Sequence, residues 1–235
     1  MAVITEPGAC DSDDTCQRAV EALSQAVSNG KVDLISLRQQ VPSDGQKREA
    51  VLRRLVKLAQ QLLDLPAASG FRLVVSSDWV EVLDQVKVHG IHVKESHRER
   101  IPILRAKYPQ LLIGTSAHSV ESALDAYQRF VPDYFFVGTC YVTQTHPEKS
   151  ARDLEGPALP GQVAAVLRQQ VGALEPASVP VPPVLAIGGI GPQNCHEPVR
   201  TYGADGVATI RAVLQSADPA KTVQQMRISM ETGPT

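Results

Sequence analysis

Short apolar runs alternate with amphipathic stretches along nearly the whole chain. The apolar runs predict strands, and they lie at residues 2–5, 32–37, 71–75, 90–93, 111–114, 133–138, 184–187 and 203–210. They lack a strict alternation of apolar and polar positions, which is typical of parallel strands buried on both faces. The stretches between them carry apolar residues at helical spacing. We therefore expect helices over residues 15–29, 46–63, 79–88, 101–108, 119–130, 161–174 and 219–230.

This alternation of strands and helices predicts an α/β fold, a (β/α)8 TIM barrel that occupies residues 1–235 as a single domain. A doubly wound open sheet is the structural alternative. The proline-rich link at residues 176–183 is too short to join independent domains. We expect it to be a connection within one fold.

The most distinctive stretch follows the seventh strand, where the apolar run ends in Gly188-Gly189-Ile190-Gly191-Pro192. The proline can open a helix, and the first backbone N–H groups of a helix can hold an anion. The stretch 203–210 repeats the design, with a strand that leads straight into a helix. The last two such junctions of a barrel commonly form a phosphate site. The predicted phosphate ligands are Gly188, Gly189, Thr209, Ile210 and Arg211.

Composition and charge narrow the possible partners. The formal net charge is −2, so the chain lacks the global positive field of a protein that binds nucleic acid. No apolar run approaches the ~18 residues of a membrane span, and no signal peptide is evident. We expect a cytoplasmic protein, or an organellar one if a transit peptide was removed. The four cysteines show no C-x-x-C pairing, so we expect free thiols.

Polar side chains gather just after several of the predicted strands. In a barrel the carboxyl ends of the strands share one face, where the chemistry lies. The candidate residues at these ends are Arg38, Ser77, Asp78, the stretch 92–97, Ser116, His118, the stretch 139–146, Gly188, Gly189 and the stretch 209–211.

Five motifs follow one another in a characteristic order. They are Gly-Ile-His-Val at 90–93, Ile-Gly-Thr-Ser-Ala-His-Ser at 113–119, Asp-Tyr-Phe-Phe-Val-Gly at 133–138 with Thr-Gln-Thr at 143–145, Ala-Ile-Gly-Gly-Ile at 186–190 and Gly-Ala-Asp-Gly-Val-Ala at 203–208. With this spacing the chain resembles the thiamine phosphate synthase/TenI family over residues 2–219. The resemblance implies an enzyme that joins hydroxymethylpyrimidine diphosphate to thiazole phosphate and releases pyrophosphate. It also implies small phosphorylated substrates and a requirement for Mg²⁺.

The resemblance also implies roles for individual residues. Arg38 stands at the diphosphate-binding arginine, and a guanidinium fork suits phosphate oxygens. Asp78 stands at a magnesium carboxylate, with Ser77 beside it. The remaining residues expected to contact the diphosphate are Ser116, Thr143, Thr145 and His146. Together with His118, the expected catalytic residues are Arg38, Thr143 and His146.

Several motif positions depart from the family pattern. Ser36 replaces a glutamine, Gln40 a lysine and Ser77 an asparagine; His97 stands at a second metal aspartate, His146 at the catalytic-loop lysine and Arg211 at a serine. These departures leave two alternatives. One is a TenI-like thiazole tautomerase, whose usual histidine is Thr139 here, so that His118 or His146 would shuttle the proton. The other is a non-catalytic protein that binds a phosphorylated ligand.

Several site candidates also have structural alternatives. Arg38 would form an ion pair at the rim of the barrel, Asp78 would cap a helix that begins at Trp79, and His118 would orient a loop. The sequence does not define the oligomeric state, and a homo-oligomer is compatible with it.

Overall fold

Parallel strands close into a barrel in chain order, within the residues that the computed structural model describes. These residues are 1–28, 31–66, 70–143, 150–172 and 180–233. The strands are β1 (Ala2–Ile4), β2 (Leu34–Leu37), β3 (Arg72–Ser76), β4 (Gly90–Val93), β5 (Leu112–Ala117), β6 (Tyr134–Val137), β7 (Val184–Ile187) and β8 (Gly206–Thr209). The predicted (β/α)8 fold class is confirmed, and the doubly wound alternative is wrong.

Most of the helices lie where the periodicity predicts them. The α-helices are α1 (Asp13–Val27), α2 (Gly45–Leu63), α3 (Ile101–Lys107), α4 (Val120–Phe130), α5 (Leu159–Gly172), α6 (Arg211–Leu214) and α7 (Pro219–Thr232). Short 3₁₀ segments are η2 (Ser77–Asp84), η3 (Glu95–Arg100) and η4 (Ala151–Asp153), and η5 (Glu197–Thr201) is π-helical.

The described chain divides into two compact units. The first comprises residues 1–92 and 210–227, and the second comprises residues 93–209 and 228–235, without the ranges left out above. Each unit is described here by itself. The prediction of one single domain stays a prediction.

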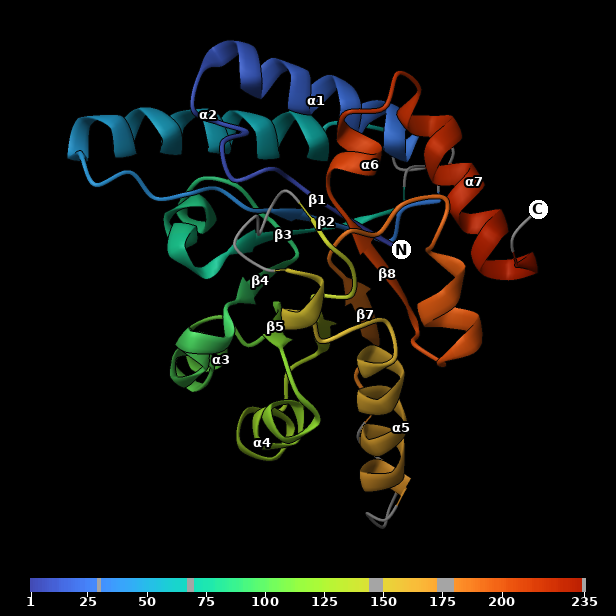
Figure 1. Ribbon diagram of the computed structural model, residues 1–235. Coiled ribbons are helices and arrows are strands. Elements are labelled where there is room, and N and C mark those ends of the chain that lie inside the picture. The colour runs from blue at the N-terminus through green and yellow to red at the C-terminus, as the bar shows by residue number, and fades with distance from the viewer. Residues whose placement is uncertain (29–30, 67–69, 144–149, 173–179, 234–235) are drawn as a thin grey trace. The chain divides into compact units, whose positions relative to one another are not determined.

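The first unit contains the ladder β1–β2–β3–β4, in which Val3 pairs with Ile35 and Val74 with Gly90. Helices α1 and α2 lie side by side in it (Figure 1). The predicted helix over 79–88 is wrong, because the structure has the 3₁₀ segment η2 instead. Trp79 leaves helical geometry (φ −128°, ψ 39°). Its buried indole N–H donates to the Gln39 carbonyl at 2.9 Å, a tertiary contact that no periodicity reveals.

The second unit contains the ladder β5–β6–β7–β8. One face of β5 and β6, with Ala117, Phe135 and Val137, packs in an apolar cluster with residues of α4 and α5. Because side chains alternate along a strand, Ser116 lies on the other face of β5.

Pro192 does not open a helix, contrary to the sequence prediction. The chain makes one turn there, closed by a hydrogen bond from the Cys195 N–H to the Gly191 carbonyl at 3.0 Å. The Asn194 side chain accepts from the Gly191 N–H at 2.8 Å and donates to the Gly189 carbonyl at 3.0 Å. These local side-chain bonds compete with helix formation.

Two further expectations concern the chain as a whole. All four cysteines are buried free thiols, as expected. In the described ranges no helix combines the length and the apolar character that crossing a bilayer requires.

Candidate active site

Arg38 follows β2 and is held by its backbone. Its N–H donates to the Thr5 hydroxyl, and that hydroxyl donates to the Arg38 carbonyl, both at 2.7 Å. The side chain is half-buried, and burial lowers the pKa of Arg38. Among the described residues its guanidinium has no hydrogen-bond acceptor and no carboxylate partner. The rim ion pair considered from the sequence is therefore absent from this part of the chain.

His92, on β4, interacts electrostatically with Arg38. Burial, followed by the positive charge of Arg38, lowers the pKa of His92 to about 3. The imidazole is therefore neutral near pH 7, and Arg38 carries the positive charge of this pair. A desolvated arginine without a protein counter-charge is well suited to bind an anion from solution.

Ser77 and Asp78 lie in the first turn of η2. The cap of this segment is Ser76, whose hydroxyl accepts from the Asp78 N–H at 3.4 Å. Asp78 therefore lies inside this segment rather than at its cap, and its carboxylate is half-buried. Ser77 is fully buried, and its hydroxyl has no partner among the described residues.

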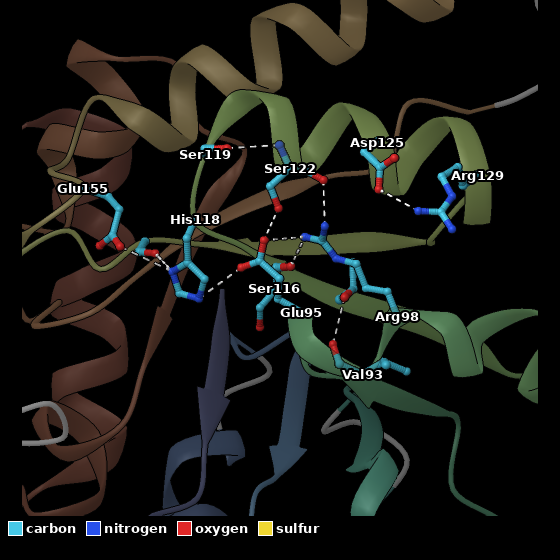
Figure 2. A network of polar contacts seen from close by, with 12 residues as sticks. Val93, Glu95, Arg98, Ser116, His118, Ser119, Ser122, Asp125, Arg129 and Glu155 are labelled. Carbon is cyan, nitrogen blue, oxygen red and sulfur yellow. Dashed lines mark hydrogen bonds and ion pairs between the residues drawn. The ribbon is translucent and has the colours of Figure 1, made fainter.

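His118 stands between two carboxylates in the second unit (Figure 2). Its Nε2 lies 3.5 Å from Oε2 of Glu95, and its Nδ1 lies 3.6 Å from Oε1 of Glu155. Nδ1 also contacts the Gly138 carbonyl. A carbonyl oxygen only accepts, so Nδ1 is assigned as protonated and donating. Both ring nitrogens of His118 thus face protein groups.

Arg98 fixes the position of Glu95 and of the neighbouring backbone. It is nearly buried, its guanidinium lies 3.4 Å from Oε1 of Glu95, and it donates to the Ser122 carbonyl at 2.8 Å and to the Ser116 carbonyl. The Ser122 hydroxyl donates to Glu95 as well. Figure 2 shows that the network joins η3, the end of β5 and the first turn of α4. Glu95 is therefore held by Arg98, Ser122 and His118.

The glycine junction after β7 lies against the chain that follows β6. Gly188 and Gly189 have φ values of 103° and 64°, which favour glycine. A Cβ on Gly188 would lie 2.5 Å from Cγ2 of Thr139 and 2.9 Å from the Cys140 nitrogen. Close backbone approach thus requires glycine here. Among the described residues the N–H groups of Gly189 and Ile190 have no hydrogen-bond acceptor, so they are available to an anion.

Thr209 ties the end of β8 to this junction. Its buried hydroxyl donates to the Ile190 carbonyl at 2.8 Å. Ile210 and Arg211 follow in the chain but belong to the first unit, where Ile210 precedes α6 and Arg211 begins it. The predicted junction of a strand that leads directly into a helix is confirmed at this point.

The loop after β6 is only partly described. Thr143 is half-buried and lies within the described residues, whereas Thr145 and His146 lie outside them. The Tyr141 hydroxyl donates to Glu197 at 2.7 Å and anchors the start of this loop.

A family model for thiamine monophosphate synthase matches residues 1–213 of the chain. The chain belongs to this family. The resemblance seen in the ordered motifs is therefore confirmed.

Individual members of the thiamine monophosphate synthase family are similar over most of their length. A thiamine-phosphate synthase of Chloroflexus aurantiacus is 31% identical over 182 residues, which is 77% of this chain and 75% of that protein. One of Geobacillus kaustophilus is 31% identical over 203 residues, covering 86% of this chain and 80% of the relative. A solved thiamine phosphate pyrophosphorylase from Pyrococcus furiosus superposes with a TM-score of 0.66 at 23% identity, covering 100% and 96% of the two chains. That likeness supports the fold alone.

Within this family member, sequence reasoning missed two residues of the second unit. Arg98 lies in the run Glu-Ser-His-Arg-Glu-Arg, which resembles a solvated surface, and Glu155 lies in a long polar loop. No sequence signal distinguishes them, because their partners come from other elements. A buried arginine is apparent only once the network around Glu95 is known.

Proposed function

We propose that the protein is a thiamine phosphate synthase, a transferase that joins hydroxymethylpyrimidine diphosphate to thiazole phosphate. The bond between the hydroxymethyl carbon and the diphosphate oxygen breaks, and pyrophosphate leaves with the electron pair. The thiazole nitrogen then forms the new carbon–nitrogen bond. Family membership and relatives named thiamine-phosphate synthase support this proposal. The structural observation that carries it is the desolvated Arg38, which lacks an acceptor among the described residues.

Arg38 would bind the diphosphate and stabilise the leaving group. Its fixed positive charge opposes the negative charge that grows on the departing pyrophosphate, and its backbone is already fixed through Thr5. For Ser116 and Thr143, which belong to the second unit, the family resemblance alone implies hydroxyl contacts to a diphosphate. Thr145 and His146 would act from the part of the loop that lies outside the described residues. Ser77 would contact the substrate through its hydroxyl, for which the described part of the chain offers no partner.

The glycine junction would hold the phosphate of the thiazole substrate. The N–H groups of Gly189 and Ile190 have no acceptor in the described chain and would donate to the phosphate, while Gly188 permits this backbone to pack closely against Thr139 and Cys140. Thr209 would fix this backbone through Ile190. For Ile210 and Arg211, which belong to the first unit, a role in binding this phosphate rests on the sequence alone.

Magnesium fits this site only as an ion shared with the substrate. In the described ranges no group of three or more His, Cys, Asp or Glu side chains could hold a metal ion. Mg²⁺ is commonly bound by one or two carboxylates, with water and substrate phosphates as the other ligands. Asp78 would supply the carboxylate, and the ion would neutralise charge on the diphosphate. We expect a chelator to abolish product formation and excess Mg²⁺ to restore it; activity that ignores the chelator would contradict this role.

Among the described residues, no observation favours the tautomerase alternative, and His146 lies outside them. A proton shuttle needs a ring nitrogen open to the substrate, but both nitrogens of His118 face protein groups. Thr139, at the position of the TenI histidine, cannot act as a base at neutral pH. The phosphate-binding alternative is distinguished by experiment, because binding of thiazole phosphate without turnover would support it.

The decisive experiment incubates the purified protein with both substrates and Mg²⁺ and measures thiamine phosphate and pyrophosphate. We expect both products in equal amounts. Arg38→Ala should lower kcat/KM for the pyrimidine diphosphate by roughly a hundredfold, because a charge-assisted contact is lost, and Arg38→Lys should recover part of it. No product at high enzyme concentration would refute the synthase assignment. A cytoplasmic location and a homo-oligomeric state stay predictions, which cell fractionation and light scattering test.

A further inference from the structure

A single peptide unit after β6 is held at both of its polar ends. The Gly138 carbonyl accepts from Nδ1 of His118, and the Thr139 N–H donates to Oε2 of Glu155 at 2.5 Å. These two atoms belong to the same peptide plane. His118 and Glu155 also lie beside each other, with Nδ1 and Oε1 3.6 Å apart. A reversal of this peptide would break both hydrogen bonds at once.

The two side chains are themselves fixed by their surroundings. Nε2 of His118 faces Oε2 of Glu95 at 3.5 Å, and Glu95 is held by Arg98 and Ser122. Figure 2 shows the imidazole lying between the two carboxylates. Glu155 has a side chain that is 18% exposed, so its bond to the Thr139 N–H is largely shielded from water. The network therefore restrains the rotation of His118.

The two residues that follow this peptide hydrogen-bond to the backbone at the start of the glycine junction. The Cys140 N–H donates to the Ile187 carbonyl at 2.9 Å, and the Tyr141 N–H donates to the Gly188 carbonyl at 3.0 Å. The Thr139 carbonyl accepts from the Gly156 N–H at 3.2 Å, which ties the loop bearing Glu155 to the same segment. The direction of the Gly138–Thr139 peptide thus sets where residues 140–141 lie along residues 187–188. Residues 140–141 thus hold the backbone of the predicted phosphate site through these two hydrogen bonds.

We propose that His118 and Glu155 are positioning residues for the thiazole phosphate. They fix the Gly138–Thr139 peptide and, through residues 140–141, the backbone at Gly188–Ile190. Neither side chain needs to touch the substrate for this role. The inference rests on the proposed synthase function and adds to it the residues that orient one of its two substrate sites.

The test uses pairs of variants that remove or keep each hydrogen bond. Glu155→Ala removes the acceptor for the Thr139 N–H, whereas Glu155→Gln keeps a carbonyl oxygen there. His118→Ala removes the donor to the Gly138 carbonyl, whereas His118→Asn keeps an N–H near the position of Nδ1. We expect both alanine variants to raise the KM for thiazole phosphate roughly tenfold, the size of one lost hydrogen bond to a charged group. The KM for the pyrimidine diphosphate should not change, and the Gln and Asn variants should approach the wild type.

A structural measurement accompanies the kinetics. Amide hydrogen exchange of residues 139–141 should accelerate in both alanine variants and stay slow in Glu155→Gln. Arg129→Ala is the matched control, because it breaks exposed ion pairs of the same unit, with Asp125 of α4 at 3.4 Å and with Glu99 of η3 at 2.8 Å. It should leave both KM values and the exchange of residues 139–141 unchanged.

The outcomes separate this inference from the proposed function. If the wild type makes thiamine phosphate but both KM values rise equally, or neither rises, the positioning role is refuted. If an alanine variant does not fold, the test rests on Glu155→Gln and His118→Asn. These variants retain the hydrogen bonds, so a tenfold rise in the KM for thiazole phosphate in both would contradict the positioning role. If the wild type makes no product, the synthase proposal fails. Calorimetric binding of thiazole phosphate then tests the positioning role on the same variants, and an unchanged Kd refutes it.

Discussion

Gly188 combines two requirements that only glycine meets. Its φ of 103° lies in the left-handed region, and its Cβ position is occupied by Thr139 and the backbone of Cys140. Gly203 has a similar φ of 85°, but nothing lies within 4 Å of its Cβ position. A comparison of alanine substitutions at Gly188 and Gly203 therefore separates the energetic cost of backbone strain from that of steric overlap.

Replacement of Gly188 by alanine is expected to lower the free energy of unfolding by roughly 2–4 kcal/mol, since strain and overlap add. Gly203→Ala should cost about 1 kcal/mol from backbone strain alone. Urea denaturation of both variants measures the difference. Equal losses would mean that the chain after β6 yields to the added methyl group.

Residues with local signatures were predictable, and residues with distant partners were not. Gly188 and Arg38 follow apolar runs that predict strands, so their place at strand ends could be inferred. Glu155 is separated by sixteen residues from the Thr139 N–H to which it bonds. Only the folded chain brings such a pair together, and the assigned roles in substrate binding stay predictions.

At the level of elements, one side chain links the ends of β7 and β8. Thr209 is the last residue of β8, and its hydroxyl reaches the Ile190 carbonyl across the sheet. This bond is buried, so its loss leaves a carbonyl without its partner.

Thr209→Val keeps the branched shape of the side chain but removes the donor. We expect a loss of about 1 kcal/mol in stability together with weaker binding of thiazole phosphate. Thr209→Ser, which retains the hydroxyl, is the control and should bind nearly as well as the wild type. Calorimetry with thiazole phosphate measures the effect, and equal affinities for Val and wild type would argue against a role for Thr209 in the cradle.

Periodicity predicted the elements well where they bury a regular stripe. Helix α2 was predicted over residues 46–63 and is found at Gly45–Leu63. The pattern failed at η2, where Trp79 departs from helical geometry to reach Gln39. It failed again at Pro192, where the Asn194 side chain captures the backbone. In both places one specific hydrogen bond outweighs the weak preference of the sequence for a helix.

At the scale of the whole molecule, the half-buried His92 is expected to make the free energy of unfolding depend on pH. Its pKa of about 3 in the folded state lies below the usual value of 6.5. Between these two values the unfolded chain binds more protons, so stability falls as the pH drops below about 6.5.

We expect a loss of roughly 1–2 kcal/mol between pH 6.5 and 5. His92→Asn should remove this part of the slope, measured by urea denaturation at each pH. If His92→Asn keeps the wild-type slope, other titratable groups cause the pH dependence of stability. A single cooperative transition in these experiments would also support the prediction of one domain.

Trp79 has a further consequence, for spectroscopy. It is the single tryptophan of the chain, it is fully buried, and its indole is bonded to the carbonyl directly after Arg38. The chain therefore has a single tryptophan fluorophore, and it contacts the residue next to Arg38, which is proposed to bind diphosphate. Emission from this indole reports on the Arg38 segment without any added label, so ligand titrations can be followed in the unmodified protein.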